Sequence, residues 1–150
     1  MVLLLRTGED EVSAPAHIRD LGALVDDARR TGLHIEFQGP LLDRDDLPAA
    51  IDHGTYRIVQ EALTNAVKHC PDGHTRVEVA VRDSKVQVSV DSTPASAPAD
   101  VTTSPSPGIG LTHMRERAEM LGGTLSAGWL DEQGGTWRVQ AGLPVREVAR

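Results

Sequence analysis

The sequence has 150 residues, of which 39% are apolar and 25% are charged, and this composition is typical of one globular domain with a sizeable core. Its formal net charge of −7 argues against non-specific nucleic-acid binding, and its single cysteine, Cys70, excludes an internal disulfide. The longest apolar run, residues 2–5, is far shorter than the roughly 20 residues of a membrane span, so we expect a cytoplasmic domain without membrane contact.

The first part of the chain predicts a helix and a strand. Residues 1–16 begin with MVLLLR and continue in a polar stretch, so they are either the end of a helix or a short first strand. Residues 17–31 predict a helix, because apolar residues recur at helical spacing and Gly32 follows where a C-terminal cap is needed. Residues 33–37 alternate apolar and polar side chains, which predicts a strand. A turn-rich segment with room for a short strand comes next.

A long helix and a hairpin are predicted in the middle of the chain. Pro48 stands where the first turn of a helix tolerates proline, and the apolar pattern continues to His69. Residues 75–82 and 85–91 alternate valine with polar residues, which predicts a hairpin with one buried face. Residues 92–107 consist mainly of Ser, Thr, Pro and Ala, so we expect a loop there.

The last part predicts one more helix and one more hairpin. The helix follows Gly108 and Gly110 and ends at Gly122, and residues 124–129 and 134–144 form the hairpin. The order of elements predicts an α+β fold: a two-layer sandwich in which about three helices cover one face of a mixed, mostly antiparallel sheet.

A line of polar residues accompanies the apolar stripe of the long helix. Glu61, Asn65 and His69 are each one helical turn apart, and Lys68 lies beside them. They fall on the border of the stripe, where a side chain is partly desolvated and still within reach of a ligand. The alternative interpretation is the solvated face of an ordinary amphipathic helix.

The glycines before the last helix strengthen the ligand interpretation. Gly108 and Gly110 would let the backbone approach a phosphate closely, and the helix after them offers free N–H groups and the positive end of its dipole. They follow a long loop, an arrangement typical of a lid over a nucleotide. The charged segment RERAE in this helix is interpreted as a solvated face, with the alternative that Arg115 or Arg117 reaches a phosphate.

Four motifs carry a family resemblance: YRIVQEALTNAVKH, the aspartate of VSVD, GIGLTHMRERAEMLGGTL and GGTWRVQAGLP. In that order they resemble the N box, the G1 box, the G2 box and the final strands of sensor histidine kinases. The pattern around MRERAEMLGG resembles the subfamily paired with LuxR-type response regulators. The resemblance implies the Bergerat ATP-binding fold of the GHKL superfamily over residues 17–145. It also implies that residues 1–16 are the remnant of a dimerisation helix and its linker, that 92–107 form a flexible ATP lid, and that 146–150 are a tail.

The resemblance implies roles for four residues of the long helix. Asn65 would coordinate the Mg²⁺ that bridges the nucleotide phosphates. Glu61 would be the catalytic carboxylate that orients or deprotonates the nucleophile. Lys68 and His69 would contact the phosphates.

The remaining implied contacts bind ATP from the strands and from the last helix. Asp91 would accept a hydrogen bond from the adenine amino group, and Thr136 would lie near the adenine. Gly108, Gly110 and Leu111 match the G2 box. The cofactors implied are therefore ATP and Mg²⁺.

The resemblance implies a protein-histidine kinase that transfers the γ-phosphoryl group of ATP to a histidine on a separate dimerisation domain. That domain is absent from this chain, so we expect the chain to be a monomer that acts on a LuxR-type response regulator only indirectly. Two other functions remain open: an anti-sigma-factor-type serine kinase, and a degenerate module that binds nucleotide or partners without turnover.

One motif departs from the pattern. The G1 box usually reads Asp-x-Gly-x-Gly, whereas this chain has DSTPA at residues 91–95. Thr93 and Ala95 replace the glycines, and Pro94 fixes a backbone angle between them. We therefore expect weak nucleotide binding, or a lid that is disordered without nucleotide.

Overall fold

The computed structural model describes residues 17–39, 47–70, 72–94, 108–130 and 135–145. Four segments with sequence-based predictions lie outside these residues: the predicted dimerisation remnant and linker, most of the turn-rich segment, most of the predicted lid, and the tail (1–16, 40–46, 95–107 and 146–150).

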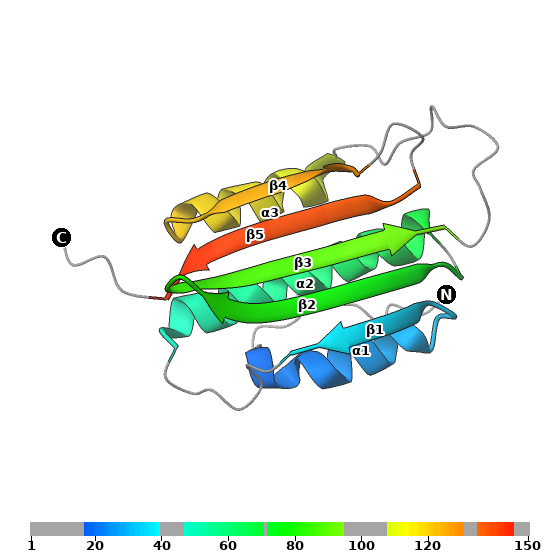
Figure 1. The fold of residues 1–150 in the computed structure, drawn as a ribbon, viewed down its shortest axis with the longest axis horizontal. Helices are drawn as coiled ribbons and strands as arrows, with labels where there is room; N and C mark the ends of the chain where they lie inside the picture. The colour runs from blue at the N-terminus through cyan, green and yellow to red at the C-terminus, as the bar shows by residue number, and fades with distance from the viewer. Residues whose placement is uncertain (1–16, 40–46, 71, 95–107, 131–134, 146–150) are drawn as a thin grey trace.

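The described residues form one five-stranded sheet and three α-helices (Figure 1). The elements in chain order are a 3₁₀ turn (Ile18–Asp20), α1 (Leu21–Arg29), β1 (His34–Gln38), α2 (Ala49–His69), β2 (His74–Arg82), β3 (Lys85–Thr93), α3 (Gly108–Met120), β4 (Thr124–Trp129) and β5 (Trp137–Pro144). The strand order is β1-β2-β3-β5-β4, with β1 and β2 parallel and the other neighbours antiparallel. The predicted α+β fold with a mostly antiparallel sheet is confirmed.

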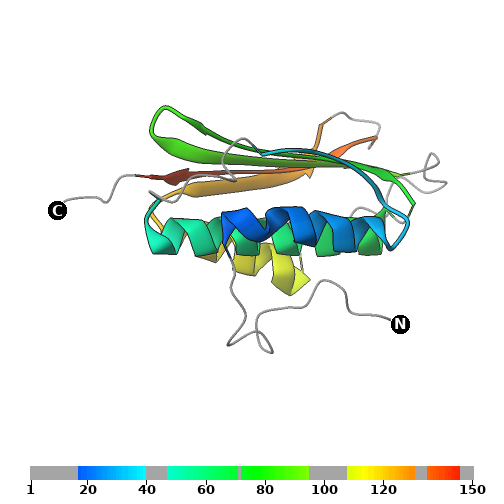
Figure 2. The same cartoon turned by 90° about the horizontal axis from the view of Figure 1, so that it is seen from below.

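The helices lie together on one face of the sheet, which gives the predicted two layers (Figure 2). Two glycines end helices as the sequence indicates: Gly32 follows α1 with φ 106°, and Gly122 follows α3 with φ 82°. A residue with a Cβ rarely adopts this left-handed backbone, so glycine is suited to both positions. Among the described residues, no helix combines the length and the apolar composition that crossing a membrane would need.

The core is built from aliphatic side chains that meet across strands. Val77 of β2 pairs with Val90 of β3, and Val90 pairs in turn with Val139 of β5; all three are buried. The next rows repeat this pattern, because successive side chains of a strand point to opposite faces and the valines of β2 and β3 occupy every second position. Each fully buried side chain of this size contributes about 1.5–3 kcal/mol by leaving water.

The predicted hairpin is confirmed at its turn, and one boundary differs from the sequence-based expectation. The loop between β2 and β3 contains only Asp83 and Ser84, whose φ angles of 55° and 61° indicate a tight primed turn. Ser92 and Thr93, predicted to begin the lid, belong to β3, because they pair with Thr75 and His74 of β2. The hydrogen-bonded neighbour strand therefore outweighs the loop-like local composition.

Candidate functional site

The predicted polar line lies on the border of the buried face of α2. Ile58, Val59, Ala62 and Ala66 are buried against the sheet, and the polar residues follow the edge of this stripe. Glu61 and Asn65 are partly buried, whereas Lys68 and His69 are exposed. The structure therefore brings these four predicted site residues together along one edge of the helix.

Helix α3 runs antiparallel to α2 and lies beside it. A Cβ on Gly54, near the start of α2, would meet the side chain of Leu121 just beyond the end of α3. Further along, Arg117 of α3 is close enough to Glu61 and Arg57 of α2 for its pKa to respond to their charges. The first turn of α3 and the last turns of α2 therefore lie toward the same end of the sheet (Figure 1).

Gly108 and Gly110 form the first turn of α3 rather than a turn before it, which corrects the sequence-based boundary. The N–H groups of the first four helical residues have no acceptor within a helix, and here those residues are Gly108 to Leu111. Together with the positive end of the helix dipole, these groups form a favourable environment for an anion. The predicted glycine motif thus lies at the end of α3 that points toward the same end of the sheet as the last turn of α2 (Figure 1).

Arg117 is a residue whose position the sequence interpretation missed. It was expected on a solvated face, but burial against α2 lowers the pKa of its guanidinium, and the nearby Arg57 lowers that pKa further, while Glu61 raises it. Its place between Met114 and Leu121, at helical spacing from both, is the sequence signal that indicated the inner side of the helix.

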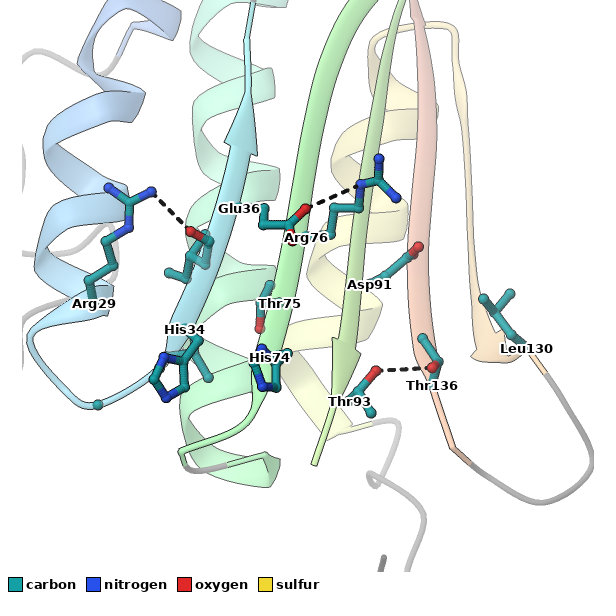
Figure 3. A pocket seen from close by; sticks show the side chains of 13 residues that line it. Arg29, His34, Glu36, His74, Thr75, Arg76, Asp91, Thr93, Leu130 and Thr136 are labelled. Carbon is teal, nitrogen blue, oxygen red and sulfur yellow. Dashed lines mark hydrogen bonds and ion pairs between the residues drawn. The ribbon is translucent and has the colours of Figure 1, made fainter. Parts of the chain in front are cut away.

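Asp91 and Thr136 lie on the opposite face of the sheet from the helices (Figure 3). The Asp91 carboxylate accepts two hydrogen bonds from Arg138, at 2.7 and 2.8 Å, and this pairing raises the pKa of the arginine. The hydroxyl of Thr136 lies 3.0 Å from that of Thr93. The structure therefore does not bring Asp91 and Thr136 together with Asn65, because the phase of each strand directs them away from α2.

These two residues line an open hollow of about 830 Å³ on the helix-free face. The stacked rings of His34 and His74, with centroids 5.0 Å apart, lie at one side of it. In the middle, Arg76 lies 3.9 Å from the Glu36 carboxylate. Oppositely charged side chains thus alternate across neighbouring strands, which is a favourable arrangement for an exposed sheet face.

Ser92 and Trp137 take the helix-facing positions next to Asp91 and Thr136. They are partners across β3 and β5, and both line a small cavity with Asn65 and His69. The sequence interpretation missed them, although the valine alternation of β3 places Ser92 in phase with the buried Val90. Trp137 also meets Trp129 edge to face, with ring centroids 5.2 Å apart.

The donors at this edge suit a cation that keeps most of its water. Among the residues that the structure describes, no cluster of three or more His, Cys, Asp or Glu side chains could enclose a metal ion. Asn65 and Glu61 offer an amide and a carboxylate oxygen one helical turn apart, which is about 6 Å along the axis. Such a sparse oxygen set fits Mg²⁺ held mainly by water and by ligand phosphates.

Comparisons with known proteins identify the family. The family model of histidine kinase-, DNA gyrase B- and HSP90-like ATPases matches residues 51–147. Sensor histidine kinase YxjM of Bacillus subtilis (strain 168) is 31% identical over 116 residues, which are 77% of this chain and 27% of that protein. The chain thus spans about a quarter of the length of this curated relative.

Two solved structures share the fold. The histidine kinase domain of the blue-light activated histidine kinase from Erythrobacter litoralis EL346 has a TM-score of 0.60 and 20% identity, covering 95% of this chain and 70% of that one. A mycobacterial sensor histidine kinase, MprB, has a TM-score of 0.59 and 19% identity, covering 87% of this chain and 94% of that one. Because the family model matches well over half of the sequence, this chain belongs to the family of histidine kinase-, DNA gyrase B- and HSP90-like ATPases.

Proposed function

We propose that this chain is the catalytic ATP-binding domain of a two-component sensor histidine kinase. It binds Mg-ATP and transfers the γ-phosphoryl group to a histidine on a separate dimerisation domain. The family membership supports an ATPase-type domain. The observation that carries the finer assignment is the line of Glu61, Asn65, Lys68 and His69 along one edge of α2, with the first turn of α3 toward the same end of the sheet (Figure 1).

The phosphate end of the proposed site combines side chains of α2 with the backbone of α3. Asn65 would hold Mg²⁺ through its amide oxygen, and the metal would offset the negative charge of the phosphates. Lys68 and His69 contact phosphate oxygens from the exposed edge of α2. The free N–H groups of Gly108, Gly110 and Leu111 donate to the same oxygens.

Glu61 is the proposed catalytic carboxylate. It lies one turn before Asn65 on the same edge of α2, and it is partly buried, so it can face a nucleophile that approaches the phosphates. Its carboxylate accepts the hydrogen bond of the incoming imidazole N–H and orients the other ring nitrogen toward the γ-phosphorus. Positioning and electrostatic stabilisation are the two contributions expected of a protein in phosphoryl transfer.

The proposed partners follow from the same assignment. The phosphoacceptor histidine comes from a dimerisation domain, and a response regulator of the LuxR-type class receives the signal downstream. The segment MRERAEMLGG, which covers the second half of α3 and the turn before β4, favours this kinase subfamily over an anti-sigma-factor-type serine kinase. The net charge of −7 agrees with the absence of a nucleic-acid partner.

A second candidate function is nucleotide or partner binding without turnover. The observation that favours it is the position of Asp91, whose carboxylate pairs with Arg138 on the face away from Asn65. The presence of both Glu61 and Asn65 argues against this second function, because a module without turnover needs no catalytic carboxylate beside a metal ligand.

Phosphotransfer to a dimerisation fragment of the same kinase class tests the proposal. The chain is mixed with that fragment and with ATP labelled at the γ-phosphate, and the acid stability of the labelled protein is measured. Acid-labile phosphate indicates phosphohistidine, whereas acid-stable phosphate indicates the serine kinase. Label transfer to neither residue, together with intact nucleotide binding, favours the binding module.

Two variants with the same chemical change make this test specific. Asn65→Asp replaces the proposed metal ligand by a carboxylate and should abolish phosphotransfer. Gln140→Glu makes the matched amide-to-carboxylate change at an exposed position on the helix-free face of β5 and should leave it unchanged. Full transfer by Asn65→Asp would show that the proposed metal site is wrong.

A further inference from the structure

The helix-facing side of β3 and β5 ends in two residues that meet the polar edge of α2. Ser92 has only 4% of its surface exposed, and its cross-strand partner is Trp137. Both line the cavity to which α2 contributes Asn65 and His69. A molecule whose phosphates lie along the edge of α2 can therefore reach Ser92 and Trp137 with its other end.

The chemistry of these side chains differs from that of a carboxylate. A carboxylate only accepts hydrogen bonds, so it suits the amino group of adenine and opposes the carbonyl oxygen of guanine. A serine hydroxyl both donates and accepts, so it suits either group. An indole stacks on any nucleobase, because every base has a π face.

Among the described residues of β3, Asp91 has the only carboxylate, and it lies away from this cavity. Asp91 is bound through both oxygens by Arg138 on the other face of the sheet. A rotamer change cannot bring it across, because side chains of neighbouring residues in a paired strand project from opposite faces. Asp91 instead lines the open hollow on that face, together with Arg76, Thr93 and Thr136.

We propose that Ser92 and Trp137, rather than Asp91 and Thr136, form the base-binding end of the nucleotide site, and that this site accepts ATP and GTP with similar affinity. This inference rests on the nucleotide binding proposed above. Ser92 contacts the exocyclic group at position 6 of the purine through its hydroxyl. Trp137 stacks on the purine ring, and Trp129 supports the indole from its edge.

The site opens when a base enters. The space that the described lining residues enclose is about 10 Å³, which is room for roughly one water molecule. Trp137 is the largest side chain of this lining, so its indole must shift to admit a purine. The chain has only two tryptophans, Trp129 and Trp137, and both are at this place, so their fluorescence reports the movement directly.

Calorimetric titration of the chain with non-hydrolysable analogues of ATP and GTP, each with Mg²⁺, tests the inference. The two dissociation constants should agree within about fivefold, because a hydroxyl serves both bases. Ser92→Asp should change their ratio by at least about tenfold in favour of ATP, mainly through loss of GTP binding. Ser126→Asp, the same change on an exposed residue of the other face, should leave the ratio unaltered.

Three further variants test the inference if circular dichroism shows that Ser92→Asp does not fold. Ser92→Ala should weaken both nucleotides and keep their ratio. Trp137→Ala should weaken both by at least about fivefold, with loss of the fluorescence change. Trp137→Phe, which retains an aromatic ring, should recover most of the affinity.

The outcomes separate this inference from the function on which it rests. ATP binding with a preference over GTP above about fivefold in the native chain overturns the inference and leaves the kinase proposal intact. The inference is also overturned if Asp91→Asn changes the ratio of the ATP and GTP dissociation constants while the Ser92 variants do not. If neither analogue binds, the proposed function itself is wrong.

Discussion

At the scale of single residues, Gly73 is a position beside Cys70 and Thr93 where the fold has no room for a side chain. It lies buried between the end of α2 and the start of β2, and a Cβ there would meet the backbone oxygen of Thr93 and, at 2.9 Å, that of Cys70. Backbone oxygens cannot rotate away, so Gly73→Ala should lower the free energy of unfolding by about 1–3 kcal/mol. Urea denaturation measures this loss.

Gly128→Ala is the matched control for that prediction. A Cβ at Gly128 has no heavy atom within 4 Å, and the residue is in strand β4. Its substitution should leave the free energy of unfolding unchanged or raise it by up to about 1 kcal/mol, because alanine restricts the unfolded chain. Equal losses in the two variants would show that the close approach at Gly73 is unimportant.

Cys70 makes stability depend on pH in the alkaline range. Burial raises the pKa of its thiol above the ordinary value of 9.0, so the folded chain binds the thiol proton more tightly than the unfolded chain does. The resulting contribution is complete below the unfolded pKa and is lost as pH rises through the folded pKa. The free energy of unfolding should therefore fall as the pH is raised above about 9.

Cys70→Ala isolates this effect, because other groups that titrate in the same range are unchanged. Urea denaturation of both proteins at several pH values, with a reducing agent present, gives the two slopes. The variant should have the shallower slope above pH 9.0. Identical slopes would mean that the thiol titrates alike in the folded and unfolded chains.

At the scale of elements, hydrophobic periodicity predicted the strands, whereas matching of motif letters selected two residues, Asp91 and Thr136, that lie on the sheet face away from α2. The valines of β3 occupy alternate positions and are buried, so the same alternation carries the buried face on to Ser92 and leaves Asp91 outside. The aspartate was chosen for its identity rather than for its phase. The lid boundary was missed for another reason, because the pairing of Thr93 with His74 is a long-range contact that local composition does not encode.

The ion pair between Asp91 and Arg138 is expected to stabilise the β3–β5 ladder only modestly. Both side chains retain some exposure, 18% for the aspartate and 37% for the arginine. A double-mutant cycle of Asp91→Asn and Arg138→Gln should give a coupling free energy of about 1 kcal/mol, helped by the two-oxygen geometry. The coupling should shrink in 1 M salt, since the Debye length falls to about 3 Å.

The same cycle bears on where nucleotide binds. Neither substitution should alter nucleotide affinity, because both side chains lie on the helix-free face. A coupling much larger than about 2 kcal/mol would mean that the pair behaves as buried. A matched loss of ATP affinity would return Asp91 to the nucleotide site.

At the scale of the whole molecule, one hydrophobic core joins the three helices to the sheet, and the candidate site lies at its margin. The core includes Ile58 and Ala62 of α2, Met114 of α3 and Val139 of β5. Binding at the edge of α2 therefore adds its free energy to the unfolding of the entire domain, because loss of the site requires loss of the packing that forms it.

Mg-ATP should accordingly raise the thermal stability of the native chain. At an ATP concentration ten times the dissociation constant, the free energy of unfolding should increase by about 1.4 kcal/mol. The altered DSTPA segment predicts weak binding, so this should require ATP well above the micromolar range. Thermal unfolding followed by circular dichroism measures the shift, and EDTA should abolish it if Asn65 acts through Mg²⁺.

Asn65→Ala and its control Gln140→Ala test whether the Mg-ATP shift depends on the edge of α2. Both remove a side-chain amide, but only Asn65 lies at the edge of α2, so only its substitution should eliminate the Mg-ATP shift. A shift that persists in Asn65→Ala, or that is insensitive to EDTA, would place the nucleotide elsewhere on the molecule. Saturation of the shift at sub-micromolar ATP would instead retain the site and contradict the weak binding expected from the altered G1 segment.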